Sequence, residues 1–299
     1  VNAAGLSATL SIDGGGTLSD VAGNPLTNLD IPTNLLDGGY QLYVETTAPT
    51  IGTITSGETA GSYGAGGTIP VVVSFINGVG GVAENVNLHS GSFDIILATG
   101  ATPPSKVSIS TDWNGSTASG DYVVAVNDVS DKLSVSSLAI GGSGSVEDIY
   151  GNGLTVLDIP GGSNLEDDRT FKIDGVAPTI VSIRTTDPNS PIGSPAGTPY
   201  GIDDYIDIDI TFSESVELLT SSLDLVLSSG KTLSVPAFTP HALTKQVRYT
   251  VAETEQTDLL EVTGTPTLAA GATLKDKLDD SPNDMADFTI PGAGNISET

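Results

Sequence analysis

The sequence predicts an all-β protein made of tandem β-sandwich repeats of about 128 residues each. Three observations predict this fold class. Short motifs recur at a nearly constant spacing along the 299-residue chain. Apolar and polar residues alternate with a period of two over many short segments, as they do in half-buried strands. No stretch of a dozen residues has the periodicity of an amphipathic helix.

The repeats are visible as pairs of matching motifs, and internal similarity at a fixed period, here about 128 residues, is the signature of a repeat architecture. The pairs are DVAGNPL at Asp20–Leu26 and DIYGNGL at Asp148–Leu154, LDIP at Leu29–Pro32 and Leu157–Pro160, and APTI at Ala48–Ile51 and Ala177–Ile180. A third copy is indicated by TLAAGATLKD at Thr267–Asp276 and FTIPGAGN at Phe288–Asn295.

These matches divide the chain into three parts. We expect the C-terminal part of a first repeat over 1–46, a second repeat over 47–174, and a third repeat over 175–299 that lacks its last strand. Because both outer copies are incomplete, we expect a fragment of a longer array. An alternative is that the incomplete ends complete one another between subunits, by strand addition.

Each copy is expected to hold about seven short strands separated by turns rich in Gly, Asn, Asp and Pro, the pattern of a β-sandwich. The clearest is YIDIDITFSE at Tyr205–Glu214, with isoleucines and Phe212 on one face and polar residues on the other. The others are 68–75, 93–98, 121–126, 131–135 and 170–174 in the second repeat, 223–228, 248–253 and 258–262 in the third, and 40–46 in the first.

The Ala-Pro pair of each APTI motif lies between the last strand of one copy and the first strand of the next. Proline fixes its own φ and restrains the residue before it. The sequence therefore predicts a semi-rigid rod of sandwiches with Ala-Pro at each joint.

The composition limits which partners and which kinds of site we expect. Ten basic residues against 37 acidic ones give a net charge of −27, which disfavours binding to a phosphate backbone and so excludes nucleic acid as the expected partner. There is no cysteine, so disulfides and thiolate chemistry are excluded. The two histidines, His89 and His241, stand in unrelated contexts, which argues against a histidine-rich metal site. The sequence has no run of about 18 apolar residues, so it predicts no membrane span.

The motifs together resemble a known family. Ala-Pro-Thr-Ile, then FSESV at Phe212–Val216, then Asp-x-x-Gly-Asn near the end of a copy, is similar to the immunoglobulin-like repeats of large bacterial surface proteins, namely adhesins, biofilm-associated proteins and S-layer proteins. The resemblance implies tandem immunoglobulin-like β-sandwich repeats, an extracellular location at the cell surface, and a structural role. This chain departs from the pattern at FINGV (Phe75–Val79) and at DKLDDSPND (Asp276–Asp284).

Carboxylates cluster in the expected loops, and calcium prefers six to eight oxygen ligands from such loops. The strongest candidate loop, close to the end of the third copy, contains Asp276, Asp279, Asp280, Asn283 and Asp284. Asp20 with Asn24 and Asp148 with Asn152 are weaker candidates, because Asp and Asn also stabilise turns through their own backbone.

Glu214 and Asp174 are expected to join a candidate loop at one pole of the sandwich, beside the linker. Related bacterial repeats hold calcium at such joints, so the resemblance implies a calcium ion that bridges neighbouring repeats. Further acidic candidates are GIDDYID at Gly201–Asp207 and LEDD at Leu165–Asp168.

Two functions follow. The first is a structural rod, a component of an S-layer or an extracellular filament, with neighbouring repeats or further copies of the chain as partners. The alternative is an adhesin stalk or tip that binds a glycan or a protein, for which the single tryptophan, Trp113, is the candidate sugar-stacking residue. We expect no enzyme, because neither histidine lies in a recognisable catalytic context and no carboxylate pair is singled out by spacing.

Overall fold

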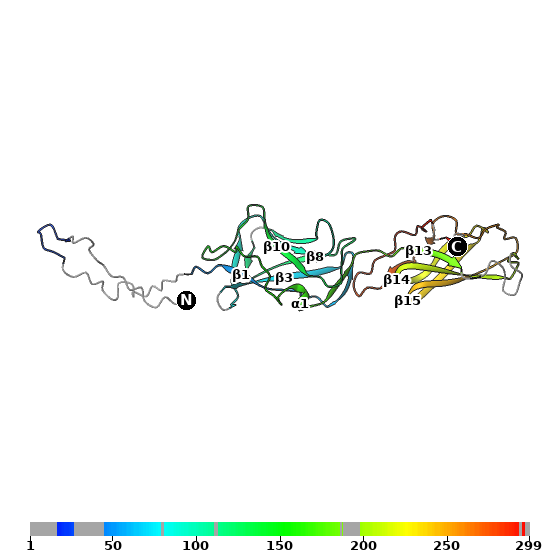
Figure 1. Ribbon diagram of the computed structural model, residues 1–299, viewed down its shortest axis with the longest axis horizontal. Coiled ribbons are helices and arrows are strands. Elements are labelled where there is room, and N and C mark those ends of the chain that lie inside the picture. The colour runs from blue at the N-terminus through cyan, green and yellow to red at the C-terminus, as the bar shows by residue number, and fades with distance from the viewer. Residues whose placement is uncertain are drawn as a thin grey trace.

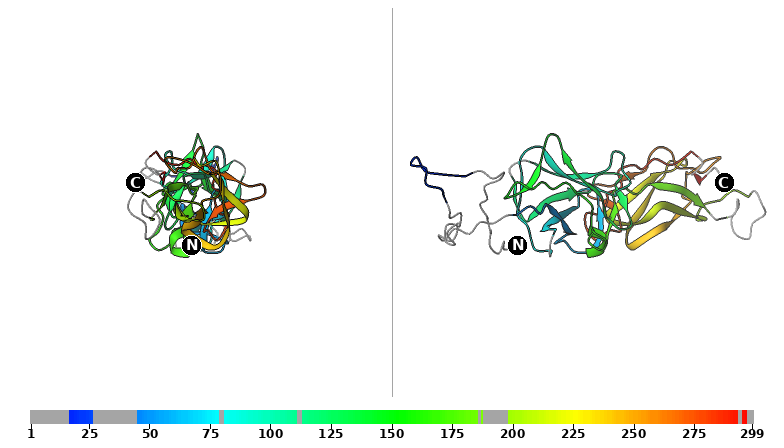
Figure 2. Two further views of the ribbon diagram at one scale, coloured as in Figure 1. Left: turned by 90° about the vertical axis from the view of Figure 1, so that its right-hand side faces the viewer. Right: turned by 60° about the vertical axis from the view of Figure 1, so that its left-hand side comes forward.

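Alternating apolar residues build strands throughout the chain, and the prediction of an all-β fold is confirmed. The computed structural model describes residues 17–26, 45–78, 81–110, 113–185, 187, 198–292 and 295–296. Apart from the short segment 17–26, these residues form two β-sandwich-like units with separate hydrophobic cores, which lie end to end along one axis (Figure 1). We call them the middle unit (45–174) and the C-terminal unit (175–296). Seen down the long axis, the two units overlap (Figure 2).

The middle unit has four three-stranded sheets in the orders β1-β3-β8, β10-β5-β6, β11-β4-β7 and β2-β12-β9. Its elements are β1 (Pro49–Thr55), β2 (Gly61–Gly64), β3 (Thr68–Asn77), β4 (Val86–Leu88), β5 (Ser92–Leu97), β6 (Lys106–Ser110), β7 (Asn114–Gly115), β8 (Thr117–Val123), β9 (Val129–Ser130), β10 (Val135–Gly141), β11 (Val146–Asp148), α1 (Leu165–Asp168) and β12 (Phe171–Asp174). Strand β3 shows why the sequence folds this way, since every second side chain from Ile69 to Phe75 is fully buried.

The C-terminal unit is one five-stranded sheet system centred on a long strand. Its elements are β13 (Ile180–Thr185), β14 (Tyr205–Val226), β15 (Thr232–Thr250), β16 (Thr267–Leu268) and β17 (Thr273–Asp276), with β14 between β13 and β15 and also paired to β16 and β17. The separate strands expected at 205–214 and 223–228 are therefore one strand. Register shifts between Thr211 and Ser222 interrupt the pairing of β14 with β15. On its other edge, β13 pairs with the first half of β14, and β16 and β17 pair with the second half.

Three shorter expectations differ from the structure or fall outside it. Residues 131–135 and 258–262 are not strands. In the first segment only Val135 is in a strand, as the first residue of β10, and in the second only Val262 forms a bridge, to Leu227. The sequence pattern does not predict a helix, yet α1 forms one turn, stabilised by a capping box in which Asn164 and Asp167 satisfy each other's backbone amides. The expected strand at 40–46 lies almost wholly outside the described residues.

The departure at FINGV marks an insertion. Strand β3 continues to Asn77, and Ala83 then bridges Ile76 while the Glu84 amide donates to the Phe75 carbonyl over 2.9 Å. Val86 then pairs with Asp148, as Val216 pairs with Asp276 in the C-terminal unit. The counterpart of Glu214 is therefore Glu84 and not a residue of FINGV.

The joint between the units is made by backbone hydrogen bonds. A loop of the C-terminal unit lies along the free edge of β2, where the amides of Asp279 and Asp280 donate to the Ser62 carbonyl over 3.1 and 2.9 Å. The Gly64 amide donates to the Asp280 carbonyl over 3.0 Å, and Tyr63 forms a parallel bridge with Asp280. The edge of one unit is thus paired by the other, which fixes their relative orientation.

The connecting segment is itself attached to the middle unit. The Gly175 amide donates to the Asp128 carbonyl over 2.7 Å, and the Gly175 carbonyl accepts from the Asn127 amide over 2.9 Å. Only a few residues, including Ala177 and Pro178, then separate this anchor from β13.

Gly64 has no room for a side chain, because a Cβ there would lie 2.0 Å from the Ser281 carbonyl oxygen. We predict that Gly64→Ala pushes the loop away from β2 and broadens the distribution of inter-unit orientations, measured by small-angle X-ray scattering. Gly57→Ala is the matched control, since a Cβ at Gly57 meets nothing within 4 Å. Indistinguishable scattering from the two variants would contradict this account of the joint.

Candidate cation site at the joint

Asn283 is the centre of the candidate site. It is 6% exposed, and its side-chain amide nitrogen donates to the Asp276 carboxylate over 2.7 Å and to the Asp174 carbonyl over 2.6 Å. Its side-chain oxygen accepts from the Ala65 amide over 2.9 Å. One amide side chain therefore connects the end of β17, the end of β12 and the loop after β2.

Three carboxylates surround this amide. Asp276 ends β17 and is 1% exposed, Asp174 ends β12, and Glu214 lies within β14. Asp276 also accepts from the Asn283 backbone amide over 2.8 Å. Two basic side chains lie beside the cluster: the Lys172 Nζ is 3.9 Å from the Asp174 carboxylate, and the His241 Nε2 is 3.2 Å from the Asp276 carbonyl oxygen. Three acids thus meet at a partly buried position, with one lysine and one histidine beside them.

The electrostatics follow from this crowding. Burial, together with the charges of Asp174 and Asp276, raises the pKa of Glu214 to about 7. Burial also raises the pKa of Asp276, although the hydrogen bonds from Asn283 oppose the shift. A cation among these oxygens would relieve both effects, because it favours the charged carboxylates.

An equivalent arrangement lies at the opposite end of the middle unit. Asn152 donates from its side-chain amide to the Asp148 carboxylate over 2.8 Å and to the Glu45 carboxylate over 2.6 Å. Burial, then the charges of Asp148 and Glu45, raise the pKa of Glu84. Burial alone would raise the pKa of Asp148, but its hydrogen bonds with Asn152 and the Tyr150 amide hold it below the usual value. The same four positions therefore recur at both ends of one unit.

The structure brings together Asp174, Glu214, Asp276 and Asn283 among the sequence-predicted residues, and it separates three others from them. Asp279 accepts from the Ser62 amide over 2.9 Å, while Asp280 uses its backbone in the bridge to β2. Asp284 is 66% exposed at its side chain and lies 3.4 Å from the Lys275 Nζ. The contacts of these three acids therefore lie outside the cluster.

Asp20 and Asn24 form a turn in which Asp20 accepts from the backbone amides of Ala22 and Asn24, each over 2.9 Å. Asn152 and Tyr150 bond to Asp148 in the same way. Both motifs therefore form turns locally, and Asp148 is also part of the acidic cluster around Asn152.

Four of the six remaining acidic candidates are used locally. Asp167 caps α1, and Asp168 accepts from the Ser56 amide over 3.1 Å. Asp204 accepts from the Gly201 amide over 2.7 Å, and Asp207 forms a two-pronged ion pair with Arg248 at 2.7 and 2.8 Å. Each of these carboxylates already has a structural partner.

Glu45 and Glu84 were missed from the sequence. Glu45 lies one repeat length before Asp174, and the segment Glu84-Asn85-Val86 matches Glu214-Ser215-Val216. The second match was hidden by the insertion, which displaces Glu84 from the end of β3.

Within the described residues, no group of three or more acidic or histidine side chains has an arrangement that would already chelate a metal ion. The carboxylate and backbone carbonyl oxygens of the cluster nevertheless suit a hard cation such as calcium. Asp174, Glu214 and Asp276 would supply the charged ligands.

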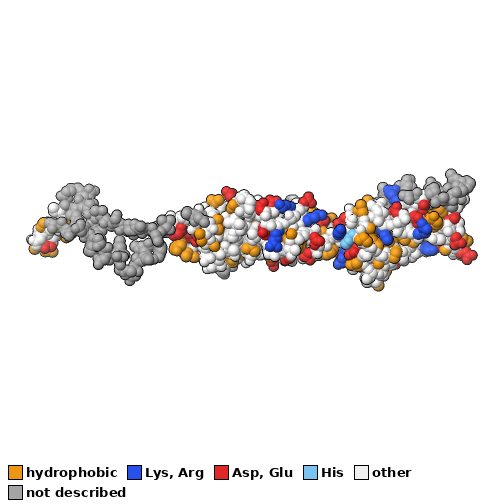
Figure 3. Space-filling view, turned by 90° about the horizontal axis from the view of Figure 1, so that it is seen from below, with side chains coloured by type: hydrophobic (Ala, Val, Ile, Leu, Met, Phe, Trp, Pro, Cys, Tyr) orange, Lys and Arg blue, Asp and Glu red, His pale blue; other side chains and the backbone are white. Residues whose placement is uncertain are grey.

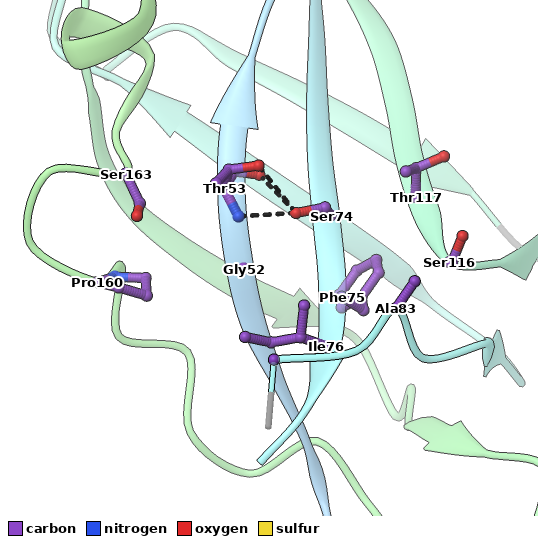
Figure 4. A pocket seen from close by; sticks show the side chains of 11 residues that line it. Gly52, Thr53, Ser74, Phe75, Ile76, Ala83, Ser116, Thr117, Pro160 and Ser163 are labelled. Atoms are coloured by element: carbon purple, nitrogen blue, oxygen red, sulfur yellow. Dashed lines mark hydrogen bonds between the residues drawn. The ribbon is translucent and has the colours of Figure 1, made fainter. Parts of the chain in front are cut away.

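Other surface features offer little chemistry. A hollow of about 460 Å³ on the middle unit is lined by small and apolar side chains without a titratable group, and the hydroxyls of Thr53 and Ser74 bond to each other over 3.0 Å (Figure 4). Trp113 packs against the core, with its ring centroid 5.5 Å from that of Phe75. Acidic and basic side chains are interspersed on the face in Figure 3. None of the described helices is long and apolar enough to cross a membrane.

No protein-family model matches this sequence, and no curated protein is similar to it. Among solved structures, dimeric latent PorU from Porphyromonas gingivalis matches 85% of this chain and 21% of its own chain, at 10% identity and a TM-score of 0.19. This chain therefore spans about a fifth of the length of that protein. A TM-score this low carries no argument about fold or function.

The pKa of Glu214 gives a testable pH dependence. Its folded value of about 7 lies above the ordinary 4.5, so the folded state holds the proton more tightly. The resulting stabilisation is complete below pH 4.5 and is lost as the pH rises through 7. In the presence of a chelator, we expect the melting temperature to fall over this range more steeply in the wild type than in Glu214→Gln.

Glu253→Gln is the matched control, because Glu253 is exposed in the same unit. A slope that is the same in Glu214→Gln as in the wild type would show that Glu214 does not hold a raised pKa.

Proposed function

We propose that this chain is part of a structural cell-surface protein whose tandem immunoglobulin-like repeats, about 128 residues each, form a calcium-stiffened rod. The observation that carries the proposal is the acidic cluster around Asn283, which joins two units and recurs around Asn152. A component of an S-layer or an extracellular filament is the role that these features support best.

The joint explains why a cation would stiffen the rod. Asp174 belongs to the middle unit, whereas Glu214 and Asp276 belong to the C-terminal unit. Without a cation, their mutual repulsion opposes the close approach that the backbone bonds of the joint impose. A bound calcium ion would replace this repulsion by attraction, because the carboxylates of both units would then bind the same cation.

The extracellular setting gives the site a supply of calcium. Extracellular calcium modules commonly work at dissociation constants of about 10⁻⁴ to 10⁻³ M. The net charge of −27 and the absence of cysteine suit a secreted surface protein. The adhesin alternative receives less support, because Trp113 contributes its ring to the core of the middle unit.

Thermal unfolding with calcium and with chelator at matched ionic strength tests the proposal. A ligand that binds only the folded state stabilises it by about 2.7 kcal/mol at a hundredfold excess over its dissociation constant. We expect calcium to raise the melting temperature in a saturable way, magnesium to do so much less, and the effect on the C-terminal unit to disappear in the double variant Asp174→Asn, Glu214→Gln.

Asp284→Asn is the control, because it removes an exposed carboxylate from the same loop but outside the cluster. An equal response to calcium in the double variant, or an equal response of the wild type to magnesium, would rule out the calcium joint.

A further inference from the structure

The sequence contains two motifs for N-glycosylation, in which asparagine is followed by any residue except proline and then by serine or threonine. They are Asn114-Gly115-Ser116 in the middle unit and Asn295-Ile296-Ser297 near the end of the chain. Such a motif suits a bulky surface glycan where the asparagine side chain is exposed and is not engaged by the fold. The two asparagines differ in this respect.

The Asn295 side chain is engaged by the fold. Its amide nitrogen donates to the Val262 carbonyl over 2.9 Å, and its oxygen accepts from the Val262 and Ile296 amides over 3.0 and 2.8 Å. Ile296 is 6% exposed and belongs to the core of the C-terminal unit. A sugar joined to the Asn295 nitrogen would therefore compete with the bond to Val262 and would crowd this core.

The same structural role recurs one repeat earlier. Asn164 holds Val135 through two hydrogen bonds of 2.9 and 3.0 Å, in the same way that Asn295 holds Val262. Asn164 is followed two residues later by Glu166, so it lies in no glycosylation motif. The fold uses an asparagine at this position in both units, which explains Asn295 without a glycan.

Asn114 has no such role. It is exposed and lies in β7, the last strand of the sheet β11-β4-β7. Across the part of the chain that the structure describes, no hydrogen bond engages its side-chain amide. The preceding residue, Trp113, packs against the core, and successive side chains of an extended segment point to opposite sides. The Asn114 amide is therefore directed away from the core into solvent.

The backbone of the motif is held on both sides of Asn114. The Trp113 carbonyl accepts from the Leu88 amide over 2.9 Å, and the Ser116 carbonyl accepts from the Phe75 amide over 2.9 Å. The intervening residues pair with β4. The exposed amide is thus presented from a fixed backbone on the surface of the middle unit.

The second polar group of the motif, the Ser116 hydroxyl, is also free of the fold. Ser116 lines the hollow of about 460 Å³ on the middle unit (Figure 4). No hydrogen bond from a described residue engages its hydroxyl. The motif requires this hydroxyl as well as the asparagine, so both of its chemical groups are accessible in the folded chain.

We propose that Asn114 is an acceptor site for N-glycosylation from a lipid-diphosphate oligosaccharide. In this transfer the Asn114 Nδ2 forms a bond to C1 of the first sugar and gives up one proton to a base of the transferring enzyme. The bond between C1 and the diphosphate oxygen breaks, and the lipid diphosphate leaves. The proposal rests on the extracellular location in the proposed function, because this motif is modified in exported chains.

A glycan at Asn114 would also protect the sheet to which β7 belongs. Strand β7 pairs only with β4 among the described strands, so it is an edge strand. Exposed edges invite pairing with another chain. A bulky hydrophilic group on this strand would hinder such pairing on a protein surface.

Transfer in vitro onto the folded 299-residue chain tests the proposal. The chain is incubated with a purified oligosaccharyltransferase and a lipid-diphosphate oligosaccharide, without calcium, and mass spectrometry of the intact chain and its peptides locates the product. We expect one glycan per chain, at Asn114. Asn114→Gln and Ser116→Ala should each abolish the transfer, with little change in melting temperature, because neither side chain is bonded within the fold.

Two variants are matched controls that should leave the transfer unchanged. Thr117→Ala removes a neighbouring exposed hydroxyl outside the motif, and Ser297→Ala removes the second motif while it keeps the Asn295 side chain. A peptide of residues 109–121 reports in parallel whether the enzyme accepts the sequence outside the fold.

An enzyme that modifies neither the peptide nor the chain, or only the peptide, would overturn the proposal, and so would transfer to Asn295 in place of Asn114. Because the reaction needs neither calcium nor a cell surface, its failure would not affect the calcium joint. A failure of the calcium joint would likewise leave this result unchanged.

Discussion

The hydrogen bonds of one buried side-chain amide hold the molecule together at its centre. Asn283 satisfies Asp276 within its own unit, the Asp174 carbonyl at the end of the other unit, and the Ala65 amide beside β2. Only an amide side chain supplies both a two-proton donor and an acceptor at one such position without charge. The close approach of three carboxylates, the pairing of the β2 edge and the alignment of the two units all depend on it.

The two ends of the middle unit show how one pattern serves two purposes. Around Asn152 the Asp-x-x-Gly-Asn sequence makes a tight turn in which the aspartate stays acidic. Around Asn283 the longer loop keeps the same carboxylate–amide pair and adds residues that reach across to β2. Greater burial at the second place outweighs the hydrogen bonds, which is why the pKa of Asp276 rises and that of Asp148 falls.

Sequence patterns predicted the features that depend on neighbouring residues. The alternation of Ile206 to Phe212 predicted a half-buried strand, and the Asp-Asn spacing placed Asp276 and Asn283 in one loop. The continuation of β14 through its register shifts was not predictable, because it depends on which strands pair with each half. The pairing of Gly61–Gly64 with the far unit was equally hidden, since that segment has no apolar alternation and its partner belongs to the other repeat, far along the chain. Glu84 was missed because an insertion separates it from β3, whereas its counterpart Glu214 lies within β14 itself.

The position of β12 has a mechanical consequence. It is the last strand of the middle unit and leads through the anchored Gly175 directly into the linker, so a pull on the C-terminal unit acts on β12 along its own length. Its flanking bonds to β2 and β9 then share the load in shear, since the strands lie along the pulling direction and their bonds lie across it. The small sheet β2-β12-β9 is therefore the one that sets how much tension the rod transmits before it yields.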